Sequence, residues 1–297
     1  MCYNRGMEYC DCCPRRCRAD RVNTTGYCGE RGLKIARASL HMWEEPPISG
    51  TRGSGTIFFS GCNLKCVYCQ NYDISRGKGS QLTVAQLADL FKRIEDSGAH
   101  NVNLVTATHF SDMIVKAFEL YKPSIPVVYN CGGYESKETL SRLDGIVDVY
   151  LPDFKYADDA LAKKYSNAPD YFEVCTGAIK EMRRQQPEDI LRDGLMKKGM
   201  IIRHLVLPDA TANTLKVLDW IKDNLSSKTY ISVMGQYIPF GEAKKYPPLD
   251  RKLKPIEYKI AVSHALKCGF DNAFVQDTDS ADDKYVPDFD ESPIPSY

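Results

Sequence analysis

The alternation of short apolar runs with helical patterns after residue 50 is the feature that most restricts the fold. The runs predict strands at 55–61, 101–106, 125–130, 146–155, 200–208, 229–237 and 272–276. Apolar residues at helical spacing predict helices at 83–98, 111–121, 136–143, 212–225 and 255–269, and a longer helical region that breaks near Pro187. Thr83 is a suitable N-cap for the first of these helices, and Gly98 follows its end.

Alternating strands and helices predict a parallel sheet, because each helix carries the chain back to start the next strand in the same direction. We therefore expect an α/β fold, either a doubly wound sheet or a complete or partial (β/α) barrel. In both architectures, ligands bind at the carboxyl ends of the strands.

The chain divides into three parts by composition. Residues 1–50 are rich in Cys and Arg with little periodicity, and we expect a small module held by a metal. Its end, "HMWEEPPISGTRGSG", reads as a Pro- and Gly-rich connection. Residues 51–276 form the predicted α/β domain, and the acidic segment 277–297 is predicted to be irregular.

The overall charge and hydropathy disfavour several classes of partner. Lys and Arg total 39, as do Asp and Glu, so no broad positive field attracts nucleic acid. No apolar run approaches the length of a membrane span, and the N-terminus lacks the apolar segment of a signal peptide. We expect a cytoplasmic protein, and its twelve cysteines point to metal binding rather than to disulfides.

Three cysteines follow the first predicted strand, in the stretch "SGCNLKCVYCQN" at 60–71. Cys62, Cys66 and Cys69 can converge on one centre. A [4Fe–4S] cluster normally has four cysteine ligands, so three would leave one iron open. A structural zinc ion would need a fourth protein ligand, which this loop does not contain. Three buried, unligated thiols are the alternative, but buried structural cysteines do not cluster on a loop.

The spacing C-x3-C-x2-C after the first strand resembles the signature of the radical S-adenosylmethionine (SAM) enzymes, and Tyr68 occupies their aromatic position before the last cysteine. Further stretches, "CPRRC", "GYCGERG", "WEEPPISGTRGSGTIFFSGCNLKCVYCQN", "LVTATHF" and "YLPDFKY", resemble the pyruvate formate-lyase activating enzyme-like subgroup. This similarity runs from about Cys10 to the last strand.

The resemblance implies a partial (β/α)6 barrel with a [4Fe–4S] cluster held by Cys62, Cys66 and Cys69. SAM would chelate the open iron, and a flavodoxin- or ferredoxin-type donor would supply one electron. Reductive cleavage would then give a 5′-deoxyadenosyl radical that takes a hydrogen atom from the substrate. A barrel interior would shield that radical from solvent.

Resemblance also assigns residues to SAM. Tyr68 would place its backbone near the adenine. Asp153 and Lys155 match an Asp-x-Lys at the methionine end of SAM, where Lys155 can pair with the carboxylate. Alternation along the strand puts both on one face. An ordinary salt bridge at the end of a strand is the alternative for this pair.

The remaining SAM-binding candidates are less regular. The second strand ends in "TATHF", where most of the superfamily has a Gly-Gly-Glu type stretch, so Thr106, Thr108 and His109 offer substitute partners. A capping or surface role is the alternative for His109, and His204, beside Arg203, can equally be a packed residue. The candidates from this group and from the later strands are Thr108, His109, Asn130, Arg203 and Gln236.

Four N-terminal cysteines, Cys10, Cys13, Cys17 and Cys28, can close a second metal site, with Cys12 outside the set. Zinc is the first choice, because four-cysteine sites are usually structural. A second [4Fe–4S] cluster is the alternative, because Cys-Pro steps and irregular spacing also suit clusters.

Three functions fit these features. The first is an activase that makes a glycyl radical on a partner protein, and the short C-terminal end, without a capping extension, favours it. The second is a stand-alone radical SAM enzyme that modifies a small molecule or another macromolecule. The third is an electron-transfer or scaffold protein, which would need neither an open iron nor the Asp-x-Lys stretch.

Overall fold

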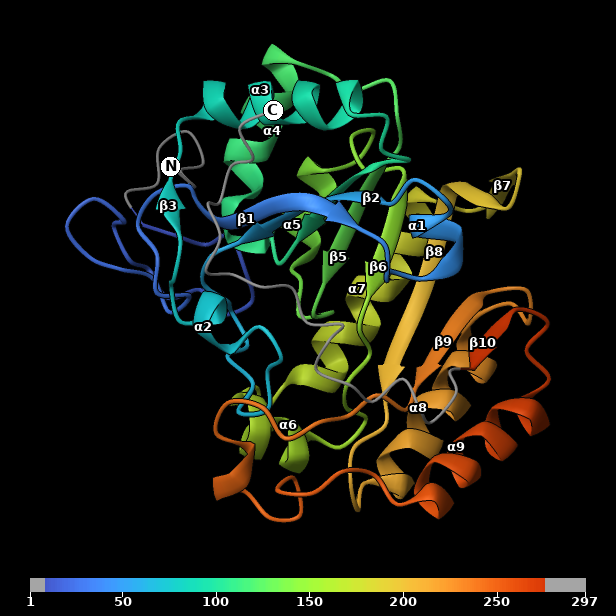
Figure 1. Cartoon of the computed structure of the whole chain (residues 1–297). Helices are drawn as coiled ribbons and strands as arrows, with labels where there is room; N and C mark the ends of the chain where they lie inside the picture. The colour runs from blue at the N-terminus through green and yellow to red at the C-terminus, as the bar shows by residue number, and fades with distance from the viewer. Residues whose placement is uncertain (1–8, 276–297) are drawn as a thin grey trace.

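A computed structural model describes residues 9–275, which form one curved, open sheet covered by helices (Figure 1). The strands are β1 (Lys34–His41), β2 (Ser54–Phe59), β3 (Ser80–Gln81), β4 (Val102–Val105), β5 (Val127–Cys131), β6 (Val149–Pro152), β7 (Ile190–Arg192), β8 (Leu195–Leu205), β9 (Tyr230–Met234) and β10 (Ala273–Val275). The helices are α1 (Pro46–Ser49), α2 (Tyr72–Ser75), α3 (Val84–Asp96), η1 (Thr108–Phe110), α4 (Ser111–Leu120), α5 (Lys137–Arg142), α6 (Asp159–Ser166), α7 (Tyr171–Gln185), α8 (Thr211–Asn224), η2 (Ala243–Lys245) and α9 (Pro255–Cys268).

The sheet confirms the predicted α/β class and the partial barrel. Its strand order is β10-β9-β8-β6-β5-β4-β2-β1-β3, and the strands from β2 to β10 along this order pair in parallel. β10 and β3 end the order without pairing to each other, so the sheet does not close. The carboxyl ends of β2, β4, β5, β6, β8, β9 and β10 therefore meet at one edge, where the three-cysteine loop begins.

The predicted elements are found close to their expected bounds. Thr83 is the N-cap of α3, where its side chain and Gln86 form a reciprocal capping box, and Gly98 follows the helix with a φ of +80°. The long helical region divides into α6 and α7, and α7 ends before Pro187. The antiparallel hairpin of β7 and β8 was not predicted, although Asp193 and Gly194, both with positive φ, are a recognised hairpin signal.

Part of the N-terminal segment belongs to the main sheet. β1 pairs antiparallel with β2 from Ile35 to His41, so residues before position 50 contribute a strand to the main sheet. The pattern of β1 is hard to recognise because a register shift between Ile35 and Arg37 interrupts the alternation of the strand. The predicted irregular tail, 277–297, lies outside the described residues, and no helix within 9–275 could cross a bilayer.

The connection after β1 packs against the sheet and fills space there, so we call it a plug rather than a linker. α1 follows two glutamates, and its Ile48 is 1% exposed. Ile48 packs with residues of the inner sheet face and its neighbouring hairpin, namely Val128, Val149, Leu151, Met196 and Ile201. This packing covers the part of the inner face that these residues form, and it holds the preceding residues, Glu44 and Glu45, against the same face.

Replacing Ile48 by Ala should lower the free energy of unfolding by about 2–5 kcal/mol, because it leaves a cavity in this plug. Chemical denaturation under anaerobic conditions measures the change. Ile256→Ala is the matched control, since Ile256 is 57% exposed on α9 and should change stability by no more than about 0.5 kcal/mol. Equal losses in the two variants would contradict the role assigned to α1.

Candidate functional site

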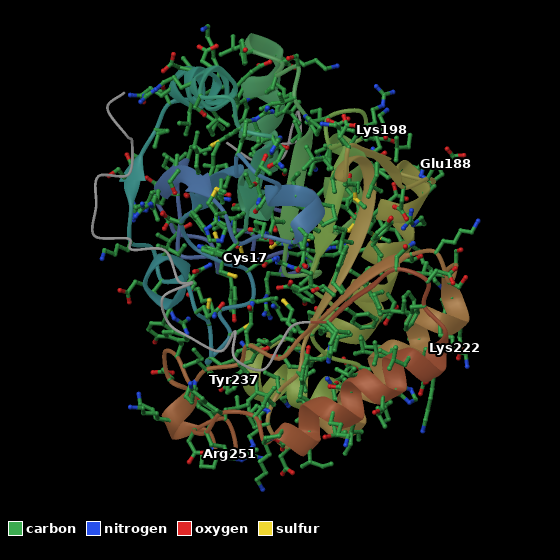
Figure 2. The ribbon with its side chains drawn as sticks, turned by 45° about the vertical axis from the view of Figure 1, so that its right-hand side comes forward. Cys17, Glu188, Lys198, Lys222, Tyr237 and Arg251 are labelled. Carbon is green, nitrogen blue, oxygen red and sulfur yellow. The ribbon has the colours of Figure 1, made fainter. Side chains whose placement is uncertain are left out.

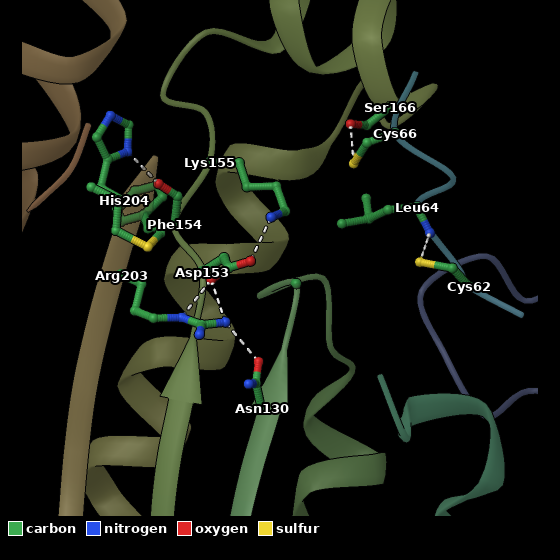
Figure 3. A network of polar contacts seen from close by, with 12 residues as sticks. Cys62, Leu64, Cys66, Asn130, Asp153, Phe154, Lys155, Ser166, Arg203 and His204 are labelled. Carbon is green, nitrogen blue, oxygen red and sulfur yellow. Dashed lines mark hydrogen bonds and ion pairs between the residues drawn. The ribbon is translucent and has the colours of Figure 1, made fainter. Parts of the chain in front are cut away.

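The three-cysteine loop leaves β2 at the carboxyl edge of the sheet. Gly61 opens it with a φ of +78°, and a Cβ there would come within 2.7 Å of the Cys28 carbonyl oxygen. Glycine is therefore required on both conformational and steric grounds. The Cys62 Sγ accepts a hydrogen bond from the Leu64 N–H at 3.4 Å, and the Ser166 hydroxyl donates to the Cys66 Sγ at 2.9 Å (Figure 3).

These cysteines fit an iron–sulfur cluster. A tetrahedral zinc site with Zn–S bonds of about 2.3 Å holds its sulfur atoms about 3.8 Å apart. Within residues 9–275, no three cysteine sulfurs lie within 4.8 Å of one another, so the loop is more open than a zinc site. A cubane needs wider spacing because each cysteine binds a separate iron. Hydrogen bonds to two of the sulfurs also suit thiolate ligands.

Burial affects the protonation of the thiols. It raises the pKa of the Cys69 thiol to about 12 and also raises the pKa of Cys66, while the positive charge of Lys155 opposes both changes. Metal binding needs thiolates, so filling the site would release protons.

Asp153 lies just beyond β6 and joins two cations. Its Oδ2 accepts from the Lys155 Nζ at 2.5 Å, and its Oδ1 accepts from the Arg203 Nε at 2.9 Å (Figure 3). Burial by itself would raise the pKa of Asp153, but Arg203 and then Lys155 hold it below its ordinary value. Asp153 also pairs with Arg203 through an isolated backbone bridge, which brings β6 and β8 together at this edge.

Arg203 extends the network across the inner face. It donates to the Asn130 Oδ1 at 2.6 Å and pairs with the Glu44 carboxylate at 3.2 Å. Glu44 Oε1 also accepts from the side-chain amides of Asn130 at 3.1 Å and Asn103 at 3.2 Å. We call this set the inner polar cluster: Glu44, Asn103, Asn130, Asp153, Lys155 and Arg203.

Two members of the inner polar cluster were missed in the sequence. The signal for Glu44 is the pair of acidic residues in "WEEPP", which we interpreted as part of a linker. Asn103 occupies an inner position on β4, and its buried Oδ1 has no hydrogen-bond partner among residues 9–275. A buried acceptor of this kind costs about 1–3 kcal/mol unless water or a ligand reaches it.

Thr108 and His109 form their hydrogen bonds outside the inner polar cluster. The Thr108 hydroxyl donates to the buried Glu135 at 2.6 Å, and burial raises the pKa of Glu135 to about 7. The His109 Nε2 hydrogen-bonds the Ser60 carbonyl oxygen at 2.7 Å, and burial lowers its pKa to about 3. The buried turn η1 directs both side chains into the protein, so His109 is a packed residue here rather than a surface or capping one.

The other candidates divide between the inner face and the core. Arg203 faces inward, whereas His204 binds the Phe154 carbonyl and the Thr214 hydroxyl, so alternation selects the arginine. The Tyr68 hydroxyl lies 2.7 Å from that of Tyr156, which in turn contacts Ser166. Tyr68 thereby braces the cysteine loop.

Gln236 is half-buried after β9, and its amide contacts the Met234 sulfur at 3.8 Å. Neighbouring Tyr237 donates to the Leu249 carbonyl, so its hydroxyl stabilises the following loop. Gln236 is therefore joined to the end of its own strand rather than to the inner polar cluster.

The N-terminal cysteines also gather. Cys10, Cys13 and Cys28 are buried and Cys17 is exposed. A Cβ added to Gly26 would lie 3.2 Å from the Cys28 sulfur and 3.6 Å from that of Cys17.

Comparison with known proteins identifies the family. The model of the Radical SAM superfamily matches residues 56–221. Two uncharacterized proteins of Methanocaldococcus jannaschii are similar. MJ0674 is 33% identical over 278 residues, which cover 89% of this chain and 76% of that protein. MJ0808 is 21% identical over 286 residues, which cover 87% of this chain and 79% of that protein.

Solved structures that the comparison found similar include methylornithine synthase (PylB), at a TM-score of 0.46 and 14% identity over 72% of this chain and 68% of that one. SuiB of Streptococcus suis, solved with its precursor peptide SuiA, has a TM-score of 0.47 and 13% identity over 73% of this chain and 46% of that one. From the match of the family model to most of the α/β domain, we conclude that this chain belongs to the radical SAM superfamily, whose members use a [4Fe–4S] cluster and SAM.

Proposed function

We propose that this radical SAM enzyme binds SAM between its three-cysteine loop and its inner polar cluster, and activates a glycyl-radical partner protein. When bound, the cluster supplies the electron that cleaves SAM into methionine and a 5′-deoxyadenosyl radical. The protein's own residues hold the cluster, orient the cofactor and exclude water. The observation that carries the SAM site is the ion-paired Asp153, which lies between Lys155 and Arg203 beside the cysteine loop.

The charges of the site complement SAM. SAM has one carboxylate and two cationic groups, the ammonium and the sulfonium. Lys155 offers its Nζ to the carboxylate, while Asp153 and Glu44 offer acceptors to the ammonium. Lys155 and Asp153 have side chains that are 16% and 17% exposed, so a ligand can reach them without full solvation. A charge-assisted contact is strengthened in such partly dry surroundings.

Acidic groups outnumber bases on this face. Glu45 follows Glu44 and is buried, and burial raises its pKa although Arg203 opposes the change. A cationic cofactor would favour the ionised form of Glu45. The unpartnered Asn103 Oδ1 adds an acceptor for an ammonium or a hydroxyl group. Tyr68 and Gln236 stay assigned to SAM only through the family resemblance.

Support for a polypeptide substrate comes from two sources. The sequence resembles activating enzymes over most of its length. The sheet ends at β10 and β3 without closing, which suits entry of a protein segment from one side. A stand-alone enzyme acting on a small molecule remains the alternative that the experiments below distinguish.

Replacing Cys62, Cys66 or Cys69 by Ala should abolish the SAM-dependent change in the electron paramagnetic resonance (EPR) spectrum of the reduced protein. Each substitution removes a ligand of the proposed [4Fe–4S] site. Anaerobic reconstitution followed by EPR with and without SAM measures this. Cys268→Ala, on the outer helix α9, should leave the spectrum unchanged. A SAM-responsive spectrum that survives all three replacements would disprove the assignment.

Replacing Lys155 by Ala should weaken SAM binding by about 1–3 kcal/mol while the cluster still forms, because Lys155 supplies charge rather than a metal ligand. Anaerobic calorimetry gives the affinity, and iron analysis gives the cluster content. Lys198→Ala, at an exposed position on β8, is the control (Figure 2). Loss of cluster with unchanged affinity in the remaining holoprotein would mean that Lys155 is structural.

The activase role predicts a glycyl radical on another protein. Reduced holoenzyme and SAM should be added to an anaerobic extract of the source cells, and EPR should then detect a protein-based glycyl radical. One 5′-deoxyadenosine should form per radical, because each activation consumes one SAM. If the radical is absent and the low-molecular-weight fraction alone stimulates 5′-deoxyadenosine formation over many turnovers, the stand-alone function is correct instead.

A further inference from the structure

The N-terminal cysteines form a second built site that SAM binding does not use. Backbone hydrogen bonds hold this segment in place. The Cys10 N–H donates to the Ala19 carbonyl at 2.8 Å, and the Arg18 N–H donates to the Cys10 carbonyl at 3.1 Å. This closes a loop that brings the thiols of Cys10 and Cys17 into hydrogen-bond contact. The sulfurs of Cys17 and Cys28 both face Gly26.

The sequence of this site favours a cluster over zinc, because Pro14 follows Cys13 and the four cysteines are irregularly spaced, and both features are typical of cluster-binding segments. The sulfurs of Cys10 and Cys17 are in contact, but no three sulfurs of the set lie within 4.8 Å of one another in the described part of the chain. A buried cation also faces the site, because the Arg21 Nη1 lies 3.8 Å from the Cys10 sulfur and donates to the His109 carbonyl at 2.8 Å. It partly neutralises the negative charge of a thiolate-bound centre, which is one determinant of cluster potential.

The second site directly touches the three-cysteine loop of Cys62, Cys66 and Cys69, which we call the SAM-cluster loop. The Cys62 N–H donates to the Cys28 carbonyl at 3.2 Å, so one hydrogen bond connects a ligand of each site through their backbones. Gly61 allows this approach, because a Cβ would collide with that same carbonyl. The blue N-terminal segment accordingly lies against the chain leading to α2 (Figure 1).

Arg15 makes a second connection. Its Nε donates to the Asn63 carbonyl at 2.7 Å and its Nη2 donates to the Ser166 carbonyl at 3.0 Å. The Ser166 hydroxyl in turn donates to the Cys66 sulfur. Arg15 lies between Cys13 and Cys17 in the sequence. Its backbone therefore belongs to the N-terminal cysteine segment, while its guanidinium contacts the surroundings of Cys62 and Cys66.

One ligand of the second site faces solvent between two basic residues. Cys17 is exposed (Figure 2), and so are its neighbours Arg16 and Arg18. Opposite charges steer one-electron carriers to their partners and increase association rates by about 10–10³-fold. This surface therefore fits an acidic one-electron carrier protein.

We propose that Cys10, Cys13, Cys17 and Cys28 hold a second iron–sulfur cluster, which relays single electrons from an acidic carrier to the site of Cys62, Cys66 and Cys69. The reduced carrier loses one electron and the second cluster gains it. The second cluster then loses that electron to the site at the adjoining loop. No bond forms or breaks and no proton moves. The relay rests on membership of the radical SAM superfamily and not on the activase role.

The metal can be identified without the SAM cluster. A Cys62→Ala/Cys66→Ala/Cys69→Ala variant, expressed with both iron and zinc available and purified anaerobically, should retain about four iron atoms per chain and a reducible EPR signal. Adding Cys28→Ser should remove that iron. About one zinc ion per chain, or no metal in a folded triple variant, would overturn the proposal. These outcomes do not depend on whether the protein is an activase.

The relay can be followed in the wild-type holoprotein by rapid mixing with a reduced, acidic flavodoxin. Freeze-quench EPR should show the signal of the second cluster before the SAM-responsive signal, and the reverse order would overturn the relay. Arg16→Glu/Arg18→Glu should slow the first phase about tenfold or more at low salt, and less at high salt. Reduction by dithionite should be unchanged.

The matched control is Lys222→Glu/Lys228→Glu, which changes the net charge equally at exposed positions near the end of α8, far from Cys17 (Figure 2). This variant should accept electrons at the wild-type rate. Equal slowing in both double variants, or no slowing in either, would overturn the assigned docking surface.

Discussion

A carboxylate shared between two cations governs the inner face of this protein. Asp153 binds Lys155 and Arg203 at the carboxyl edge of the sheet, and Arg203 continues to Asn130 and Glu44. Removing one of the two cations would leave the charge of Asp153 less compensated in these partly dry surroundings. The pairing therefore joins β5, β6, β8 and the segment after β1 into one arrangement, and it holds polar groups where a charged cofactor can exchange partners with them.

The cysteine loop depends on a second constraint, the close approach of two backbones. Gly61 has a positive φ and lies against the Cys28 carbonyl, so the N-terminal segment and the SAM-cluster loop cannot be built independently. Ser166 and Tyr156 support the loop from the other side, where they connect Cys66 with Tyr68. These contacts hold a segment with few apolar residues against the loop of Cys62, Cys66 and Cys69.

Hydrophobic packing also supports the inner polar cluster. Ile48 packs against the inner face of the sheet, and Glu44 precedes it by only four positions. The short α1 thus converts a Pro-rich stretch into a support for an acidic group. The packing of Ile48 therefore also restricts the position of the Glu44 carboxylate, because the two residues are close in the chain.

Local sequence patterns predicted the class of fold and located the three cysteines that we propose as ligands of the SAM cluster. Apolar runs and helical periodicity are local, so they located the parallel strands and their helices, and the three cysteines follow one of those strands directly. The family resemblance added Asp153, Lys155 and Arg203, which the structure brings together. The position of β1 was not predictable in the same way, because a bulge breaks its alternation. Only the tertiary structure showed that Glu44 and Asn103 face the same network, that His109 is packed into the core, and that Cys28 adjoins Cys62. These relations join residues that are far apart in the chain. They depend on which polar groups are buried together and on which backbones approach too closely for a side chain, and only the folded chain decides both.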